Sequence, residues 1–171
     1  MAPILNILSV DFQNETPIHY FYKLFIFSDV ISMPEDAADN DLAKKGGRYC
    51  MFKVGPALIT NHGMGFGSLS INMHELIKML HYAGATDVSF LRLGTCGGLG
   101  LEPGTICLTK TGYTELLQDY LPVPSCGNVI KTKTDANPEF NDQIIKVIQQ
   151  FGYNYKIGNT VATNCFYEGQ G

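Results

Sequence analysis

Residues 88–98, VSFLRLGTCGG, are the stretch that decides how the rest of the chain is interpreted. The part from Val88 to Leu93 is almost continuously apolar, which is typical of a strand buried on both faces of a sheet. Residues 94–98 follow directly, and glycines at the carboxyl end of a strand let backbone N–H groups turn toward one point. In open α/β sheets, ligands collect at this end of the strands. The stretch therefore predicts a strand that leads into a loop able to bind a small anion.

The chemistry of this stretch depends on one arginine and one hydroxyl. Arg92 carries a planar, permanently charged guanidinium that matches phosphate oxygens, and Thr95 adds a hydroxyl donor. The stretch matches neither a Walker loop nor the GxGxxG fingerprint of dinucleotide-binding proteins. The pattern leaves two interpretations open: a phosphate site, or a tight turn in which Arg92 forms a structural ion pair.

The segments around this strand predict an α/β layered domain, because strands alternate with long helices. Runs of strand character bounded by turn residues predict further strands at residues 4–10, 48–54, 57–61, 105–109 and 153–163. Residues 19–31 are rich in aromatic side chains but follow neither the helical nor the strand period. Residues 34–41 form an acidic run that is typical of an exposed loop.

Two helices are predicted from their caps and their periodic apolar positions. The first begins with Ser68 as its N-cap and ends at Gly84. The second begins with Asn137 as its cap and Pro138 just inside it. The apolar positions at helical spacing are Met73, Leu76, Ile77, Leu80 and Ala83 in the first helix, and Ile144, Ile145 and Ile148 in the second.

Composition and charge argue against several classes of protein. Of the 171 residues, 45% are hydrophobic and 16% charged, so the chain can bury a core. The net charge of −4, with no basic cluster longer than Lys44-Lys45, argues against a nucleic-acid surface. No apolar run approaches the roughly 20 residues of a membrane span, and the start lacks the basic region of a signal peptide. Five cysteines without a CxxC pair predict reduced thiols in a cytoplasmic protein, with no metal site.

Three further residues are candidates on weaker patterns. Arg48 lies in a predicted edge strand, where an arginine is usually a solvated charge. His62 stands beside glycines; such a histidine is usually structural, although the glycines indicate close backbone approach to another segment or a ligand. Gln170 offers one acceptor and two donors, which suit the imide edge of a pyrimidine base, and an aromatic residue lies nearby.

Taken in order, several segments resemble the animal uridine phosphorylases of the nucleoside phosphorylase-I family. The matching segments are residues 48–56 (RYCMFKVGP), 62–65 (HGMG), 73–78 (MHELIK), 92–98 (RLGTCGG), 101–105 (LEPGT) and 166–171 (FYEGQG). The likeness covers about residues 48–171. It implies a single domain over residues 1–171 with a three-layer α/β fold and a mixed central sheet. That fold is expected to be incomplete at both ends, with an atypical segment at residues 1–45.

The resemblance implies phosphorolysis of uridine to uracil and ribose 1-phosphate, with phosphate as co-substrate and without a metal or organic cofactor. It implies a homodimer in which Arg48 crosses the interface into the partner's phosphate site. No residue is assigned a catalytic role. The residues implied in phosphate binding are Arg48, Arg92, Leu93, Gly94 and Thr95, and those implied in substrate binding are Cys96, Gly97, Phe166, Gln170 and Gly171.

The chain departs from the family pattern at three places. Residues 1–45 hold no glycine or arginine, so the family's first glycine turn and its arginine are not found. Cys96 stands where a serine or threonine is usual, and a thiol is the weaker donor. The base-reading arginine and the later Glu-Met-Glu stretch lie beyond Gly171 in the family. The alternative is therefore a catalytically inactive truncated isoform or paralogue that retains the dimerisation and phosphate-binding part. A purine substrate is a further alternative, against which Gln170 argues.

Overall fold

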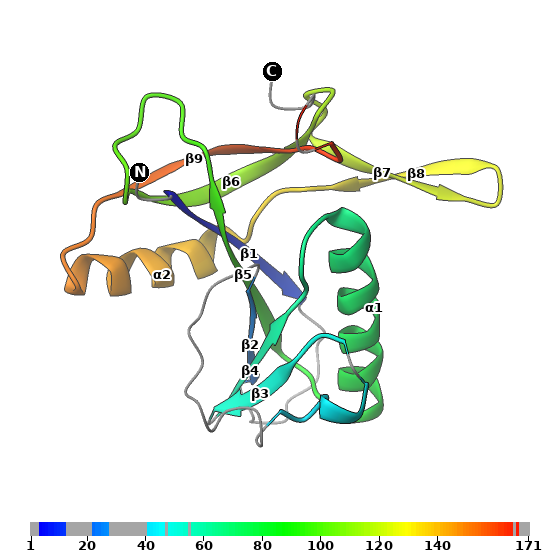
Figure 1. Cartoon of the computed structure of the whole chain (residues 1–171). Coiled ribbons are helices and arrows are strands. Elements are labelled where there is room, and N and C mark those ends of the chain that lie inside the picture. Colours follow the sequence, from blue (N-terminus) through cyan, green and yellow to red (C-terminus); the bar gives the residue numbers. More distant parts are fainter. Residues whose placement is uncertain are drawn as a thin grey trace. The chain divides into compact units, whose positions relative to one another are not determined.

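The computed structural model describes residues 41–46, 48–54, 56–165 and 167, together with the strands at residues 4–12 and 22–27 (Figure 1). The chain divides into two compact units, of which unit 1 comprises residues 1–10 and 96–171 and unit 2 comprises residues 11–95. Each unit is described by itself, and the expectation of one domain over residues 1–171 stays a prediction. Among the helices in the described part of the chain, none has the length and apolar character needed to cross a membrane.

Unit 2 contains a sheet with both parallel and antiparallel pairs. Its strands are β2 (Tyr22–Phe27), β3 (Met51–Val54), β4 (Ala57–Asn61) and β5 (Val88–Cys96), the last residue of which belongs to unit 1. β2 lies between β4 and β5 and is parallel to both, while β3 pairs with β4 in the antiparallel sense. The predicted strands at residues 57–61 and 88–93 are confirmed. β2 was not predicted, because the aromatic run at residues 19–31 follows neither the helical nor the strand period.

The start of β3 corrects the strand predicted at residues 48–54. The strand begins only at Met51, and Arg48 and Tyr49 lie in a bend before it. Tyr49 has a φ of 56°, in the left-handed region, which interrupts the extended backbone at this point. Before this bend, residues Lys44–Gly46 form a short 3-10 helix, η2.

Helix α1 (Phe66–Tyr82) begins two residues before the predicted cap. Its N-cap is Gly65, whose φ of 83° and ψ of 157° are open to glycine but strained for other residues. Ser68 therefore lies inside the first turn, and the prediction of Ser68 as N-cap is wrong. Gly84, with a φ of 67°, directly follows the C-cap residue Ala83 and confirms the predicted end of the helix.

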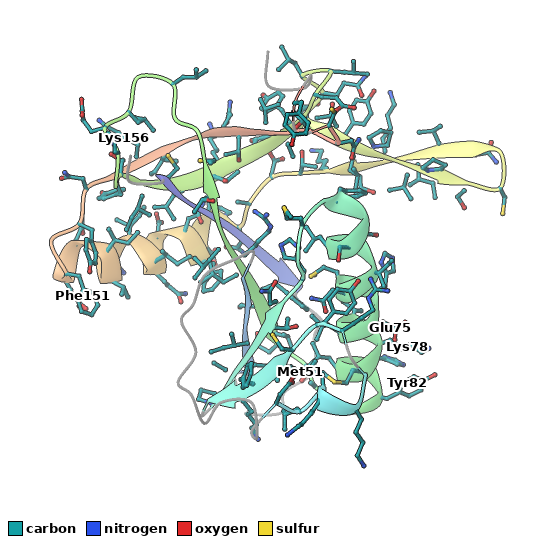
Figure 2. The ribbon with its side chains drawn as sticks, viewed as in Figure 1. Met51, Glu75, Lys78, Tyr82, Phe151 and Lys156 are labelled. Atoms are coloured by element: carbon teal, nitrogen blue, oxygen red, sulfur yellow. The ribbon has the colours of Figure 1, made fainter. Side chains whose placement is uncertain are left out.

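The buried face of α1 is narrower than predicted. Leu76 is buried as expected, and the buried Asn72 donates from Nδ2 to Thr60 Oγ1 on β4 at 3.5 Å. Ile77 and Ala83 are exposed, so the apolar face predicted for this helix is only partly right. Glu75, Lys78 and Tyr82 are exposed on the outer side of the helix (Figure 2).

Unit 1 is organised around a parallel sheet with β6 at its centre. β1 (Ile4–Phe12), whose last two residues belong to unit 2, and β9 (Tyr155–Ala162) flank β6 (Ile106–Thr114) and are both parallel to it. The strands predicted at residues 4–10, 105–109 and 153–163 are confirmed in position, and β6 is longer than expected. Helix α2 (Pro138–Gln150) packs on β6, because the buried Asn141 donates from Nδ2 to the Thr109 carbonyl oxygen at 3.0 Å.

An antiparallel hairpin completes the described part of unit 1. It consists of β7 (Tyr120–Ser125) and β8 (Asn128–Lys133), and every residue of β8 is exposed. The hairpin was not predicted from the sequence. Pro122 and Pro124 lie within β7, and prolines mark a run as turn or edge rather than as a strand interior.

Replacing Asn137 by alanine should remove the N-cap of α2. The Asn137 Oδ1 atom accepts from the Phe140 N–H at 2.8 Å, as the sequence predicted. We expect the free energy of unfolding to fall by about 0.5–2 kcal/mol, the usual effect of losing a cap. Urea denaturation would measure the change. Asn137→Ser, which keeps a capping oxygen, should lose less than half as much; an equal loss in both variants would contradict the capping role.

Candidate functional site

The sheet of unit 2 places Arg92 and His62 at the same edge. In the register of the parallel strands, Ile26 of β2 aligns with Thr60 of β4 on one side and with Arg92 of β5 on the other. Aligned residues of neighbouring strands point to one face, and side chains two residues apart along a strand share a face. His62 lies two residues beyond Thr60, just after β4 ends. The register therefore directs the Arg92 and His62 side chains to the same face.

A hydrogen bond joins these two side chains. The Nε–H group of Arg92 donates to Nε2 of His62 at 3.3 Å. His62 is buried, with 2% of its surface exposed, and Arg92 is half-buried. Burial lowers the pKa of the Arg92 guanidinium, because leaving water disfavours its charge. The structure thus holds a partly desolvated cation at the carboxyl edge of the sheet.

The segment that carries His62 is anchored by Ser68 and Tyr49. The Ser68 Oγ–H donates to the backbone oxygen of His62 at 2.5 Å, and the Ser68 Oγ atom lies 3.3 Å from the Tyr49 hydroxyl oxygen. The Tyr49 hydroxyl in turn donates to the Ser68 backbone oxygen at 3.1 Å. The left-handed backbone of Tyr49 costs on the order of 1–3 kcal/mol, and such conformations persist where surrounding contacts determine them.

Arg48 joins this network from the other end. Its Nη2 group donates to the Tyr49 hydroxyl at 2.6 Å, and its guanidinium carbon lies 4.7 Å from the centre of the Tyr49 ring. Stacking of a guanidinium on an aromatic face is favourable at an exposed site such as this one. A continuous set of contacts thus leads from Arg48 through Tyr49, Ser68 and His62 to Arg92.

The predicted glycine loop after β5 begins later than expected. β5 continues through Gly94 and Thr95 to Cys96, so the prediction that the chain turns from Gly94 is wrong. Gly94 is buried, and within the described ranges it is not among the glycines with positive φ. Leu93 is half-buried, Thr95 is exposed, and both continue the strand.

Cys96 and Gly97 open the part of this stretch that belongs to unit 1. Cys96 is half-buried and Gly97 is exposed. Burial raises the pKa of Cys96, and the nearby Cys107 thiol raises it further by its charge and by a hydrogen bond. Burial also raises the pKa of Cys107, whereas that hydrogen bond lowers it. Cys96 is therefore a neutral thiol at neutral pH, which suits a weak donor and not an activated nucleophile.

The other predicted substrate residues cannot be placed. Phe166, Gln170 and Gly171 lie outside the described residues, so their predicted roles stay predictions.

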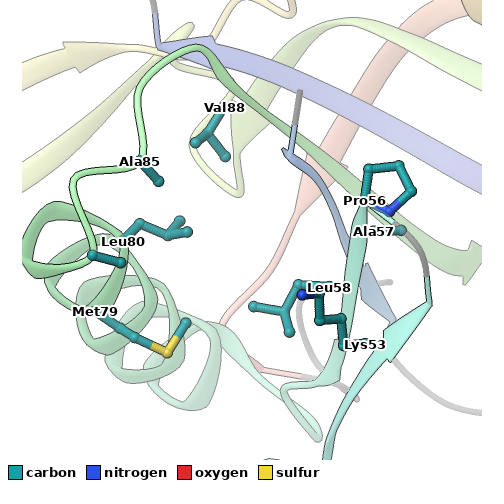
Figure 3. A pocket seen from close by; sticks show the side chains of 9 residues that line it. Lys53, Pro56, Ala57, Leu58, Met79, Leu80, Ala85 and Val88 are labelled. Atoms are coloured by element: carbon teal, nitrogen blue, oxygen red, sulfur yellow. The ribbon is translucent and has the colours of Figure 1, made fainter. Parts of the chain in front are cut away.

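The pocket in Figure 3 is separate from these residues. It has a volume of about 190 Å³ and lies in unit 2 between the β3–β4 turn and the end of α1. Its lining is apolar apart from Lys53, and it includes none of the predicted site residues. Ligand pockets typically measure roughly 300–1,000 Å³. We assign this pocket no ligand.

The sequence patterns did not reveal the hydrogen-bond partner of Arg92, which is His62, or the two residues that hold the His62 segment. His62 was interpreted as structural, Ser68 as a helix cap, and Tyr49 as an ordinary strand residue. One signal was available: a polar residue directly after the short strand at residues 57–61 lies at the edge where parallel strands present ligand-binding groups. That signal depended on recognising β2, since β2 lies between β4 and β5.

The fold and this site define an α/β protein with a mixed sheet and a partly buried arginine at the carboxyl edge of its parallel strands. The chain belongs to the phosphorylase superfamily, whose family model matches residues 29–171. The predicted family and fold class are thereby confirmed.

Named relatives and solved structures agree with this assignment. The human protein named uridine phosphorylase 2 is 33% identical over 151 residues, which are 88% of this chain and 48% of that protein. A Schistosoma mansoni protein named inactive uridine phosphorylase B is 34% identical over 130 residues, 75% of this chain and 44% of that protein. The crystal structure of Schistosoma mansoni uridine phosphorylase in complex with uracil matches with 32% identity and a TM-score of 0.76, over 87% of this chain and 56% of that one. The chain thus spans about half the length of the relatives it matches.

Proposed function

We propose that this chain forms part of a uridine phosphorylase, which converts uridine and phosphate to uracil and ribose 1-phosphate. In this reaction a phosphate oxygen bonds to C1′ of the ribose while the bond from C1′ to the base nitrogen breaks. The electron pair of that bond leaves with uracil. Positive charge develops on the ribose and negative charge on the base, so catalysis requires a well-placed phosphate and donors near the base. No metal or organic cofactor is needed.

The observation that carries the proposal is the setting of Arg92. Its guanidinium is partly withdrawn from water and is hydrogen-bonded through its Nε–H edge to His62. A guanidinium bound in this way is suited to an anion with paired oxygens, because it is a planar fork with fixed geometry. The proposed site also takes a hydroxyl from the exposed Thr95, three residues along the same strand. Strand alternation turns the Thr95 side chain to the face opposite Arg92, so the setting of Arg92 alone supports the proposal. In the proposed site, Leu93 and Gly94 contribute the backbone between these two side chains.

The remaining assignments extend the proposal to the nucleoside and the partner subunit. Cys96, Gly97, Phe166, Gln170 and Gly171 contact the nucleoside, and Gln170 reads the edge of the uracil. The protein is a cytoplasmic homodimer, and Arg48 of each subunit reaches the phosphate site of the other. The exposure of Arg48 supports this last assignment, since a crossing side chain must project from the surface of its own subunit.

Incubating the phosphorylase that contains this chain with uridine and inorganic phosphate should release uracil and ribose 1-phosphate in equal amounts. Chromatographic separation of the products would measure both, and omitting phosphate should stop the reaction. Uracil without ribose 1-phosphate would indicate hydrolysis and would contradict the proposal.

A second candidate function is a non-catalytic phosphate-binding paralogue. The observation that favours it is the similarity to a relative named as inactive. The same incubation separates the two candidates. Phosphate binding by calorimetry without any uracil release would support the non-catalytic protein, whereas turnover would exclude it.

A further inference from the structure

The ring of His62 accepts a hydrogen bond from the Arg92 side chain. Arginine can only donate hydrogen bonds, so the nitrogen that receives the Nε–H must be unprotonated. His62 Nε2 is that nitrogen, which places the proton of the neutral imidazole on Nδ1. The contact therefore requires one tautomer of a neutral ring.

The contact also fixes the direction of the guanidinium. Arg92 is long and flexible, and its planar head can rotate unless one of its edges is bound. Binding at Nε uses the one N–H of that nitrogen, whereas the two terminal nitrogens carry the other four N–H donors. An acceptor at Nε thus determines the plane and direction in which the terminal N–H groups project.

The ring of His62 is itself held in place. The residue is almost fully buried, and the Ser68 hydroxyl binds its backbone oxygen at 2.5 Å. Tyr49 contacts Ser68 through both its backbone oxygen and its side chain. The His62 ring is therefore held both by its burial and by its anchored backbone, so it can hold the Arg92 guanidinium in one orientation.

We propose that His62 is a positioning residue for the phosphate site: its Nε2 atom orients the Arg92 guanidinium so that the terminal N–H groups meet the anion. The inference rests on the proposed function for the identity of that anion. It assigns His62 no contact with substrate and no proton transfer.

The test compares three variants of the full chain. His62→Leu removes the acceptor, and His62→Gln keeps an acceptor oxygen near the position of Nε2. Thr60→Val is the control for general destabilisation, since Thr60 is as buried as His62 and lies two residues before it, and its hydroxyl accepts from the buried Asn72 rather than from Arg92. Isothermal titration calorimetry with inorganic phosphate gives the dissociation constant of each. We expect about a ten- to hundred-fold weaker affinity in His62→Leu, and less than about threefold change in His62→Gln and Thr60→Val.

Kinetics and spectroscopy add two independent readouts. In His62→Leu the KM for phosphate should rise by a similar factor while the KM for uridine changes little, a division that general destabilisation would not produce. The ¹⁵N shifts of the His62 ring in the unmodified chain should show a neutral ring protonated at Nδ1. Protonation at Nε2 would overturn the inference whatever the activity of the chain.

The outcomes separate this inference from the proposed function. Turnover with unchanged phosphate affinity in His62→Leu would overturn the positioning role and leave the function intact. Weakened phosphate binding in His62→Leu, with no turnover by the unmodified chain, would support the positioning role and contradict the phosphorolysis. Absence of phosphate binding by the unmodified chain would overturn both.

Discussion

Replacing Arg92 by methionine is expected to lower the affinity for inorganic phosphate by about 10²–10⁴-fold. Hydrogen bonds to charged groups contribute about 1.5–3 kcal/mol each, and a guanidinium can form two to one phosphate. Methionine keeps the apolar stem but offers no donor. Calorimetric titration with phosphate would measure the loss, and uracil release should fall in parallel. Wild-type affinity in Arg92→Met would exclude this strand end as the phosphate site.

Two controls distinguish lost recognition from lost folding. Arg92→Lys keeps a positive charge without the planar fork, so its affinity should lie between those of the unmodified chain and Arg92→Met. In Arg92→Met the buried His62 acceptor loses its donor, while a cation leaves a partly desolvated position. These effects oppose each other, so the free energy of unfolding should change by less than about 2 kcal/mol.

Mixing two inactive variants would test the proposed crossing of Arg48. Arg48→Met and Arg92→Met should each lose activity as separate dimers. A hybrid dimer has one site with both original arginines, because each chain supplies the residue that the other lacks. Partial recovery of uracil release on mixing and refolding is therefore expected. Unchanged inactivity of a verified hybrid would place Arg48 in its own subunit's site or outside the reaction.

Replacing Leu108 by alanine is expected to cause the largest loss of stability. Leu108 lies in the middle of β6, between β1 and β9, and has 0% of its surface exposed. Leucine-to-alanine changes at such sites cost about 2–5 kcal/mol, through lost burial and the cavity that remains. Urea denaturation of the full chain would measure the loss, and hydrogen exchange of the β6 amides would locate it in unit 1.

Leu116 provides the matched control for this prediction. Leu116 also lies in unit 1 and can undergo the same leucine-to-alanine substitution, but 74% of its surface is exposed. Leu116→Ala should change the free energy of unfolding by less than about 0.5 kcal/mol. If Leu108→Ala does not accumulate in folded form, Leu108→Met should still lose measurable stability, below about 1.5 kcal/mol. Equal effects at Leu108 and Leu116 would show that β6 is not a packed interior strand.

Local signals in the sequence predicted those elements whose physical cause is local. The cap of α2 required only Asn137 beside Pro138, and the end of α1 required only Gly84 after the last helical turn. β5 was evident because a strand buried on both faces appears as a continuous apolar run. The start of α1 was misplaced because its prediction considered only the local cap signal. Ser68 is a good cap by type, but its hydroxyl binds the His62 carbonyl, a partner that helix propensity does not reveal.

By itself, the sequence determined the family, the α/β class, and the identity of Arg92 as the central candidate for anion binding. Only the tertiary structure decided how Arg92 is held. Its partner His62 is 30 residues away along the chain, and the two meet because β2 aligns β4 and β5 in register. The aromatic run at residues 19–31 gave no periodic sign of β2, so the register could not be derived from local pattern. Strand alignment arises from pairing between distant segments, and for that reason the setting of Arg92 is a property of the folded sheet.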